Sequence, residues 1–227
     1  MADNSVIKQY NNILKRHREE RRVFDSRKSG PLSGVLEILK VAMYLNELIP
    51  KDKKLIILGI GSPDMMADFV GPCTGLLLKR ATDAIYVYGT SYSPVDASNI
   101  NEYFRLLNER HKDDFIIAID SCTFEETEKG KIVIKNRPLS PGIAIDRDNG
   151  LAPMGDISIM GIVGKDYEEM CQEDCFDLQI ASMPDFIVRS LLWYLRLFRD
   201  EPIMDIDICT DIKQSYKRKL RLQADRR

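Results

Sequence analysis

The fold is decided by Leu55-Ile-Ile-Leu-Gly-Ile-Gly-Ser-Pro-Asp-Met-Met-Ala-Asp-Phe-Val-Gly-Pro72. Its apolar start predicts a buried strand, which the following glycines and proline end in a turn. A helix is expected from about Pro72, because proline is tolerated in the first helical turn. Asp64 and Asp68 therefore fall in the loop between strand and helix. In an open α/β sheet this loop lies at the carboxyl ends of the strands, where sites usually form.

Further strands and helices follow in alternation. Runs of apolar and β-branched residues predict strands at 84–90, 115–120, 131–135 and 156–163, and amphipathic patterns predict helices at 35–48, 100–107 and 186–199. The alternation predicts a parallel sheet covered on both faces. The segment after Asp120 is too short for a helical crossover, so the 131–135 strand is expected to return antiparallel at the sheet edge. The sequence thus predicts an α/β fold, a three-layer α/β/α sandwich.

The two ends of the chain differ from this core. An amphipathic helix with a charged end through Arg22 is expected first, on the spacing of Val6, Ile7, Tyr10, Ile13 and Leu14. A short half-exposed strand at 204–208 and a frayed basic tail at 213–227 are expected last. We expect one domain over residues 1–227, with a core at about 53–164, N-terminal helices within 5–49 and a C-terminal helix at 184–199.

Composition excludes several function classes. Hydrophobic residues make up 44% and charged residues 30%, with a net charge of −2, so nothing attracts the chain to nucleic acid or to a membrane surface. No apolar run is long enough for a membrane span. A cytoplasmic protein with reduced thiols is expected, since the five cysteines are scattered and no export signal is seen. Zinc at Cys171 and Cys175 is a minor alternative.

The residues that could do chemistry are two aspartates. The two histidines, His17 and His111, lie away from the carboxyl ends of strands, which argues against Ser-His-Asp or Cys-His catalysis. Asp68 follows the first strand and Asp120 ends the third, so both are expected at one crevice. An equally open alternative is that Asp68 caps a helix and Asp120 bonds its own turn. Gly59-Ile-Gly61 is only part of a dinucleotide-binding motif.

Several ordered segments resemble one family. They are Gly59–Pro72, Val87–Thr90, Ile116–Asp120, Pro138–Gly142 and Pro153–Val163, and they are similar to the YyaC-type sporulation proteins. That family is related to the germination protease and, more distantly, to the hydrogenase maturation endopeptidases. The resemblance implies a phosphorylase/hydrolase-like fold. It also implies that Asp68 and Asp120 correspond to the catalytic pair of the germination protease.

Two departures from the related families limit what carries over. The maturation endopeptidases use a later histidine to read their metal, and this chain has no histidine after His111. The germination protease has a Pro-Gly-x-Gly loop, whereas this chain has Pro141-Gly-Ile-Ala144, without the second glycine. Nickel sensing is therefore not expected, and the loop is expected to be less open to a substrate backbone.

Together with the resemblance, the two aspartates predict an aspartic-type endopeptidase, and the resemblance implies that it cleaves a peptide bond in a specific protein partner. Asp68 and Asp120 would share one proton, with their acid and base roles unassigned. Ser62, Asp64, Ser121, Pro141 and Gly142 are candidates for supporting the pair or positioning the substrate. No cofactor is expected. The alternatives are a non-catalytic binding or regulatory protein on the same fold, and a member that binds a divalent metal at the two aspartates.

Overall fold

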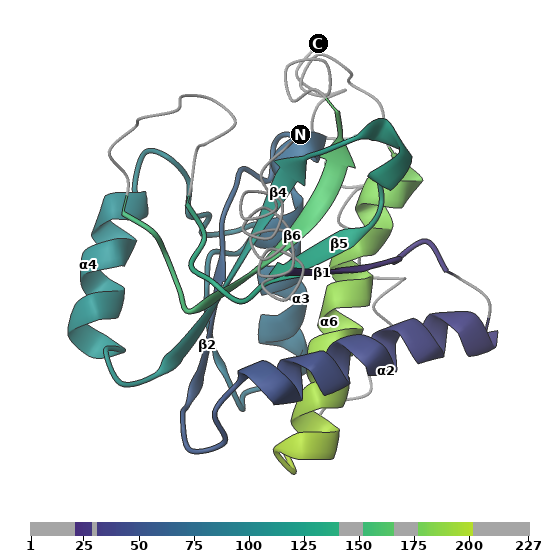
Figure 1. Cartoon of the computed structure of the whole chain (residues 1–227). Coiled ribbons are helices and arrows are strands. Elements are labelled where there is room, and N and C mark those ends of the chain that lie inside the picture. The colour runs from purple at the N-terminus through teal and green to yellow at the C-terminus, as the bar shows by residue number, and fades with distance from the viewer. Residues whose placement is uncertain (1–20, 29–30, 141–151, 166–176, 202–227) are drawn as a thin grey trace, which may run out of the picture.

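The computed structural model describes residues 21–28, 31–140, 152–165 and 177–201 (Figure 1). These residues form a six-stranded sheet in the order β1-β5-β6-β4-β2-β3. The strands are β1 (Arg21–Phe24), β2 (Leu55–Gly59), β3 (Tyr86–Tyr88), β4 (Phe115–Thr123), β5 (Ile132–Lys135) and β6 (Ile157–Gly164). β6, β4, β2 and β3 are parallel neighbours, whereas β5 is antiparallel to both β6 and β1. The predicted mostly parallel sheet with antiparallel pairing near one edge is confirmed.

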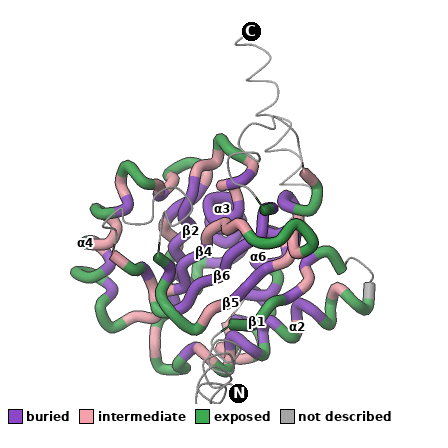
Figure 2. The backbone as a smooth tube through the Cα atoms, turned by 45° about the horizontal axis from the view of Figure 1, so that its top comes forward, coloured by how far each residue is buried: buried purple, intermediate pink, exposed green. Residues whose placement is uncertain are grey.

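Helices cover both faces of this sheet (Figure 1). α2 (Pro31–Leu48), α3 (Val70–Ala81) and α6 (Leu178–Phe198) pack on one face, where the larger core cluster lies, and α6 contacts both α2 and α3. α4 (Ile100–Arg110) packs on the other face with a smaller cluster. Figure 2 shows the buried strands running through the middle of the molecule. The three-layer α/β/α arrangement predicted from the sequence is therefore confirmed.

The N-terminal part of the described chain corrects one prediction. Arg21 and Arg22, expected at the charged end of a helix, begin β1 at the edge of the sheet, outside β5. Arg22 stacks over the Tyr44 ring at 4.0 Å and pairs with Glu47 at 3.1 Å, so its charge lies against α2. Phe24 is buried in the core. The charged composition concealed a strand in which Arg22 is partnered by α2.

Two helices begin earlier than predicted. α2 begins at Pro31 rather than Val35, because proline is compatible with the first turn of a helix. α6 begins at Leu178 rather than near residue 184, and contains Pro184. Asp177 caps it, with Oδ1 accepting hydrogen bonds from the backbone N–H groups of Gln179 (2.8 Å) and Ile180 (3.4 Å). Pro184 removes one hydrogen bond from the helix, and burial of the apolar face of α6 outweighs this loss.

Other expectations fall partly or wholly outside the described residues. The expected loop 136–155 is described at both ends, where Leu139 and Met154 pair through an isolated bridge, but 141–151 lie outside. So do the N-terminal amphipathic segment, the 204–208 strand, the basic tail and the Cys171/Cys175 pair. Among the helices that are described, none combines the length and apolar character needed to cross a membrane.

Gly71 seats α3 directly on the ends of β2 and β4. A Cβ at this position would overlap the carbonyl oxygen of Ile60 and lie 2.6 Å from that of Ile119. We expect Gly71→Ala to lower the free energy of unfolding by about 3 kcal/mol, since backbone atoms on two strands cannot move aside as a side chain can. Urea denaturation at pH 7 measures this loss.

The matched control is Gly34→Ala in α2. Alanine is favoured over glycine inside a helix, so this change should be neutral or stabilising by up to about 1 kcal/mol. Equal effects of the two substitutions would show that α3 does not depend on this close approach.

Candidate active site

β2 and β4 bring the two predicted aspartates to one crevice. The strands are parallel, with Gly59 opposite Ile119, and the next residue, Ile60, donates its N–H to the Ile119 carbonyl oxygen at 2.7 Å. Asp120 therefore lies beside the start of the turn that leads to Asp68. The predicted convergence of the two aspartates is what this register produces.

Asp68 is held by the turn that precedes it. It ends a short 3₁₀ helix, η1 (Met66–Asp68), and its Oδ2 accepts a hydrogen bond from the Ser62 N–H at 2.7 Å. Gly61 makes room for it: the glycine has φ of 130°, and a Cβ there would lie 2.9 Å from Asp68 Oδ1. The side chain does not cap α3, whose N-cap residue is Phe69. The helix-cap alternative for Asp68 is therefore wrong.

Asp120 lies inside β4 rather than at its end. The strand continues to Thr123, paired with β6, and Asp120 Oδ1 accepts a hydrogen bond from the Ser121 N–H at 2.7 Å. Alternation along the strand puts Asp120 on the same face as Ala118, which belongs to the cluster under α4. The expectation that the strand stops on this aspartate is corrected, because β6 offers backbone partners beyond it.

Burial and mutual charge perturb both aspartates. Burial raises the pKa of Asp68 to about 6. The hydrogen bond from Ser62 lowers this pKa, and the charge of Asp96 adds a smaller rise. Burial raises the pKa of Asp120 to about 8, and the charge of Asp68 adds to this rise while the Ser121 hydrogen bond opposes it. Asp68 thus ionises first, and Asp120 must ionise beside an existing negative charge. Both shifts favour the protonated form of the carboxyl group concerned.

Asp96 is a third carboxylate near the pair, which sequence reasoning missed. Val95 pairs with Ile60 through an isolated parallel bridge and its carbonyl oxygen accepts the Gly61 N–H at 2.8 Å. This contact brings Asp96 beside the turn that holds Asp68. The Asp-Ala-Ser98 sequence signals only a local turn, in which Asp96 Oδ1 accepts the Ser98 N–H at 2.9 Å.

We expect Asp96→Asn to bring the pKa of Asp68 down towards its ordinary value, because one negative charge is removed. A titration of the Asp68 carboxyl carbon by NMR measures the change. Asp64→Asn removes an exposed carboxylate from the same loop as Asp68 and should leave the pKa of Asp68 unchanged. Identical curves in both variants would contradict a contribution from Asp96.

The remaining predicted site residues divide into three groups. Ser62 and Ser121 support the pair through their backbone N–H groups. The Ser121 hydroxyl, however, is buried without a hydrogen-bond partner in the described structure, and strand alternation directs it to the face opposite Asp120. Asp64 is exposed and donates its N–H to Ser62 Oγ at 3.3 Å. Pro141 and Gly142 lie outside the described residues.

The described histidine takes no part in this site. His111 ends α4, just before β4 begins, so it lies at the amino end of that strand. Its Nδ1 is 2.8 Å from Asp114 Oδ2 and its Nε2 is 2.8 Å from the Tyr88 hydroxyl. The arrangement ties α4 to β3. His17 lies outside the described residues, and across the described ranges no three His, Cys, Asp or Glu side chains are grouped to hold a metal ion.

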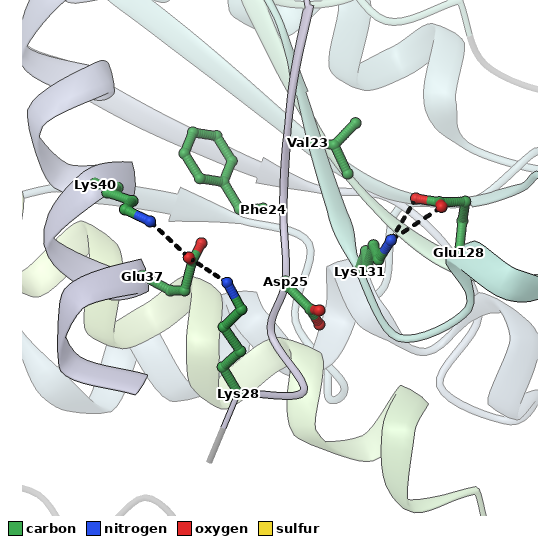
Figure 3. A pocket seen from close by; sticks show the side chains of 8 residues that line it. All are labelled: Val23, Phe24, Asp25, Lys28, Glu37, Lys40, Glu128 and Lys131. Atoms are coloured by element: carbon green, nitrogen blue, oxygen red, sulfur yellow. Dashed lines mark hydrogen bonds and ion pairs between the residues drawn. The ribbon is translucent and has the colours of Figure 1, made fainter. Parts of the chain in front are cut away.

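A separate pocket of about 460 Å³ lies beside β1 and α2 (Figure 3). Glu37 Oε1 accepts hydrogen bonds from Lys28 at 2.7 Å and Lys40 at 2.8 Å. Across the pocket, Lys131 donates to both oxygens of Glu128 at 2.9 Å. Because these opposite charges neutralise one another, we interpret the pocket as an ion-pair network that joins β1 to α2.

Glu37 is the buried member of this network, with 5% of its surface exposed. Burial opposes its ionisation, but the hydrogen bonds from the two lysines more than compensate and lower its pKa. We expect Glu37→Gln to reduce the free energy of unfolding at pH 7 by about 1–2 kcal/mol in urea, because two ammonium groups lose their charged acceptor. Glu47→Gln, which removes an exposed ion pair, should cost under about 1 kcal/mol. A smaller loss at Glu37 than at Glu47 would contradict this role.

Comparison with protein-family models assigns the chain to a family. A family model described as a protein of unknown function (DUF1256) matches residues 35–190. The chain belongs to this family. The DUF1256 match includes β2 to β6 and therefore both Asp68 and Asp120.

A curated protein with a similar sequence is the uncharacterized protein YyaC of Bacillus subtilis (strain 168), which is 34% identical over 112 residues. The alignment covers 49% of this chain and 54% of YyaC, so the chain spans about half the length of the curated relative it matches. The resemblance to YyaC-type proteins inferred from the motifs is confirmed.

Among solved structures, the chain is similar to the [NiFe] hydrogenase maturation protease HycI from Thermococcus kodakarensis KOD1. The TM-score is 0.47 at 16% sequence identity, over 67% of this chain and 99% of that chain.

Proposed function

We propose that the protein is an aspartic-type peptidase that hydrolyses a peptide bond in a protein substrate with Asp68 and Asp120. The observation that carries the proposal is the register of β2 and β4, which brings both carboxyl groups to one crevice. Both pKa values are raised, and the charge of Asp68 contributes to the rise at Asp120. A pair of carboxyl groups that holds one proton near neutral pH supplies a base and an acid at the same place.

We infer the two roles from the order of these pKa values. Asp68, with the lower pKa, is mainly ionised at pH 7 and takes a proton from the attacking water. Asp120, with the higher pKa, stays protonated and gives its proton to the carbonyl oxygen of the scissile bond. When the tetrahedral diol collapses, Asp68 returns its proton to the leaving amine and Asp120 regains the proton from the hydroxyl that becomes the new carboxyl group.

The hydrogen bonds around the pair suit this chemistry. Ser62 holds Oδ2 of Asp68, and Ser121 holds Oδ1 of Asp120, both through backbone N–H groups. Within the described residues no further hydrogen bond is made to the second oxygen of either carboxylate. Each side chain is therefore fixed by one oxygen, while the other can exchange a proton with substrate or water.

The experiment uses intact proteins from a Bacillus subtilis lysate in H₂¹⁸O, incubated with the full chain at pH 6–8. Hydrolysis predicts new carboxyl termini that each carry one ¹⁸O, detected by mass spectrometry. A non-catalytic binding protein would add no labelled termini beyond those formed by the lysate's own proteases in a parallel incubation with Asp68→Asn/Asp120→Asn. Absence of such additional labelled termini across this pH range, with the chain folded, would contradict the proposal.

A further inference from the structure

Helix α2 carries an exposed line of apolar side chains, called here the α2 stripe. Three of its members are strongly exposed: Leu32 (73%), Leu36 (48%) and Met43 (58%). Val35 is also exposed and Leu39 is half-buried. The spacing of 32, 36, 39 and 43 is four, three and four residues, which places these side chains on one side of three helical turns.

This stripe is distinct from the face that α2 packs into the core. Ile38, Val41 and Leu45 are 8%, 1% and 0% exposed, and α2 packs against α6. The helix is therefore apolar on two sides and covered on one. Figure 2 shows that α2 carries both buried and exposed residues. A contiguous exposed apolar surface of this kind marks an interaction site.

A segment of the same chain has the complementary pattern. Residues 6–14 place Val6, Ile7, Tyr10, Ile13 and Leu14 at helical spacing, with polar or charged residues between them. A nine-residue helix with one apolar face is not stable alone in water and needs a surface on which to bury that face.

The chain enters the described structure beside this stripe. Arg22 contacts Tyr44 and Glu47, which lie just beyond Met43 in α2. Six residues, 15–20, separate the segment from β1, and they can span up to about 20 Å. The stripe from Leu32 to Met43 is about 17 Å long and nine helical residues about 14 Å, so reach and length both fit.

We propose that residues 6–14 form an amphipathic helix that packs its apolar face onto the α2 stripe. A segment tethered by six residues has an effective concentration in the millimolar range, which favours it over a separate molecule. A stable dimer buries about 800 Å² on each partner, more than five side chains on three turns of one helix offer. This docking does not depend on the proposed peptidase activity.

Hydrogen exchange of the full-length chain tests the docking. We expect amides of residues 9–14 to exchange at least tenfold more slowly than in a Leu36→Asp/Met43→Asp variant, because the charges remove the apolar surface. A Tyr10→Asp/Ile13→Asp variant should in turn lose protection in residues 9–14 and increase exchange at the outer turns of α2. The control Tyr92→Asp, which changes a side chain that is 71% exposed in a loop, should do neither.

Two results would overturn the inference. One is free exchange of residues 9–14 in the unaltered chain. The other is a dimer in light scattering that the Leu36→Asp/Met43→Asp change dissociates, which would assign the stripe to a second copy. Unchanged protection in β4 and β6 of each variant verifies that the fold is retained.

Discussion

Asp120→Asn should reduce kcat/KM for peptide cleavage by about two to four orders of magnitude while the protein stays folded. Asparagine has nearly the same shape and can still accept the hydrogen bond that Ser121 donates to Oδ1. It cannot deliver a proton to the carbonyl oxygen, and positioned proton transfer contributes about 10²–10⁴ in rate. Asp68→Asn should have an effect of similar size, since it removes the base.

The variants also test whether the two residues act as a unit. The double variant Asp68→Asn/Asp120→Asn should be little slower than either single variant, because half of a shared-proton pair has no function. Asp83→Asn removes an exposed aspartate that follows α3 and should leave kcat/KM unchanged. Additive losses, or cleavage by Asp120→Asn at the original rate, would contradict the assigned roles.

The stability of the protein should fall as pH rises from about 5 to 8. The folded pKa values, about 6 for Asp68 and about 8 for Asp120, lie above the ordinary value of 3.8. In this window the folded chain holds protons that the unfolded chain has lost, so each step up in pH favours unfolding. Between pH 5 and pH 8 the two groups together predict a loss on the order of 5 kcal/mol, which ends once the pH exceeds the folded pKa of Asp120.

Urea denaturation at intervals of pH measures this slope. Asp68→Asn/Asp120→Asn should flatten it and should make the protein more stable than the original chain at pH 8, because the buried charges are gone. The carboxylates with lowered pKa, such as Glu37 and Asp177, contribute only at lower pH. A slope that the double variant leaves unchanged would show that other groups cause the pH dependence.

The parallel core could be predicted because its signals are local and strong. β2 and β6 are runs that are buried along their whole length, and β4 begins with five apolar residues, of which Ile117, Ala118 and Ile119 are buried. The glycine turn after β2 leads into α3 as the sequence indicates. The convergence of Asp68 and Asp120 follows from this pattern, since neighbouring parallel strands present their carboxyl ends at one edge.

The predictions failed where tertiary partners override local composition. Arg21 and Arg22 look like a charged helix end, yet they belong to β1, because β5 offers an edge and α2 offers Tyr44 and Glu47 to Arg22. These partners are not visible in the local sequence. α6 begins before Pro184 because Asp177 supplies a cap and Ile180, Ala181 and Met183 pack into the core.

The site was predicted in outline and missed in detail for the same reason. Asp96 lies near the pair only because Val95 bridges to Ile60, a contact between segments far apart in the sequence. The Ser121 hydroxyl is directed away from Asp120 because β4 continues past the aspartate. If the strand is assumed to end at Asp120, strand alternation cannot predict the direction of the Ser121 side chain.

NMR titration of the carboxyl carbons of Asp68 and Asp120 shows whether the two groups share one proton. Each resonance is assigned by its disappearance in Asp68→Asn or Asp120→Asn. We predict two steps, near pH 6 and pH 8, with the upper step falling in Asp68→Asn because the neighbouring charge is absent. Two independent titrations near the ordinary value of 3.8, each unaffected by loss of the other aspartate, would contradict the account.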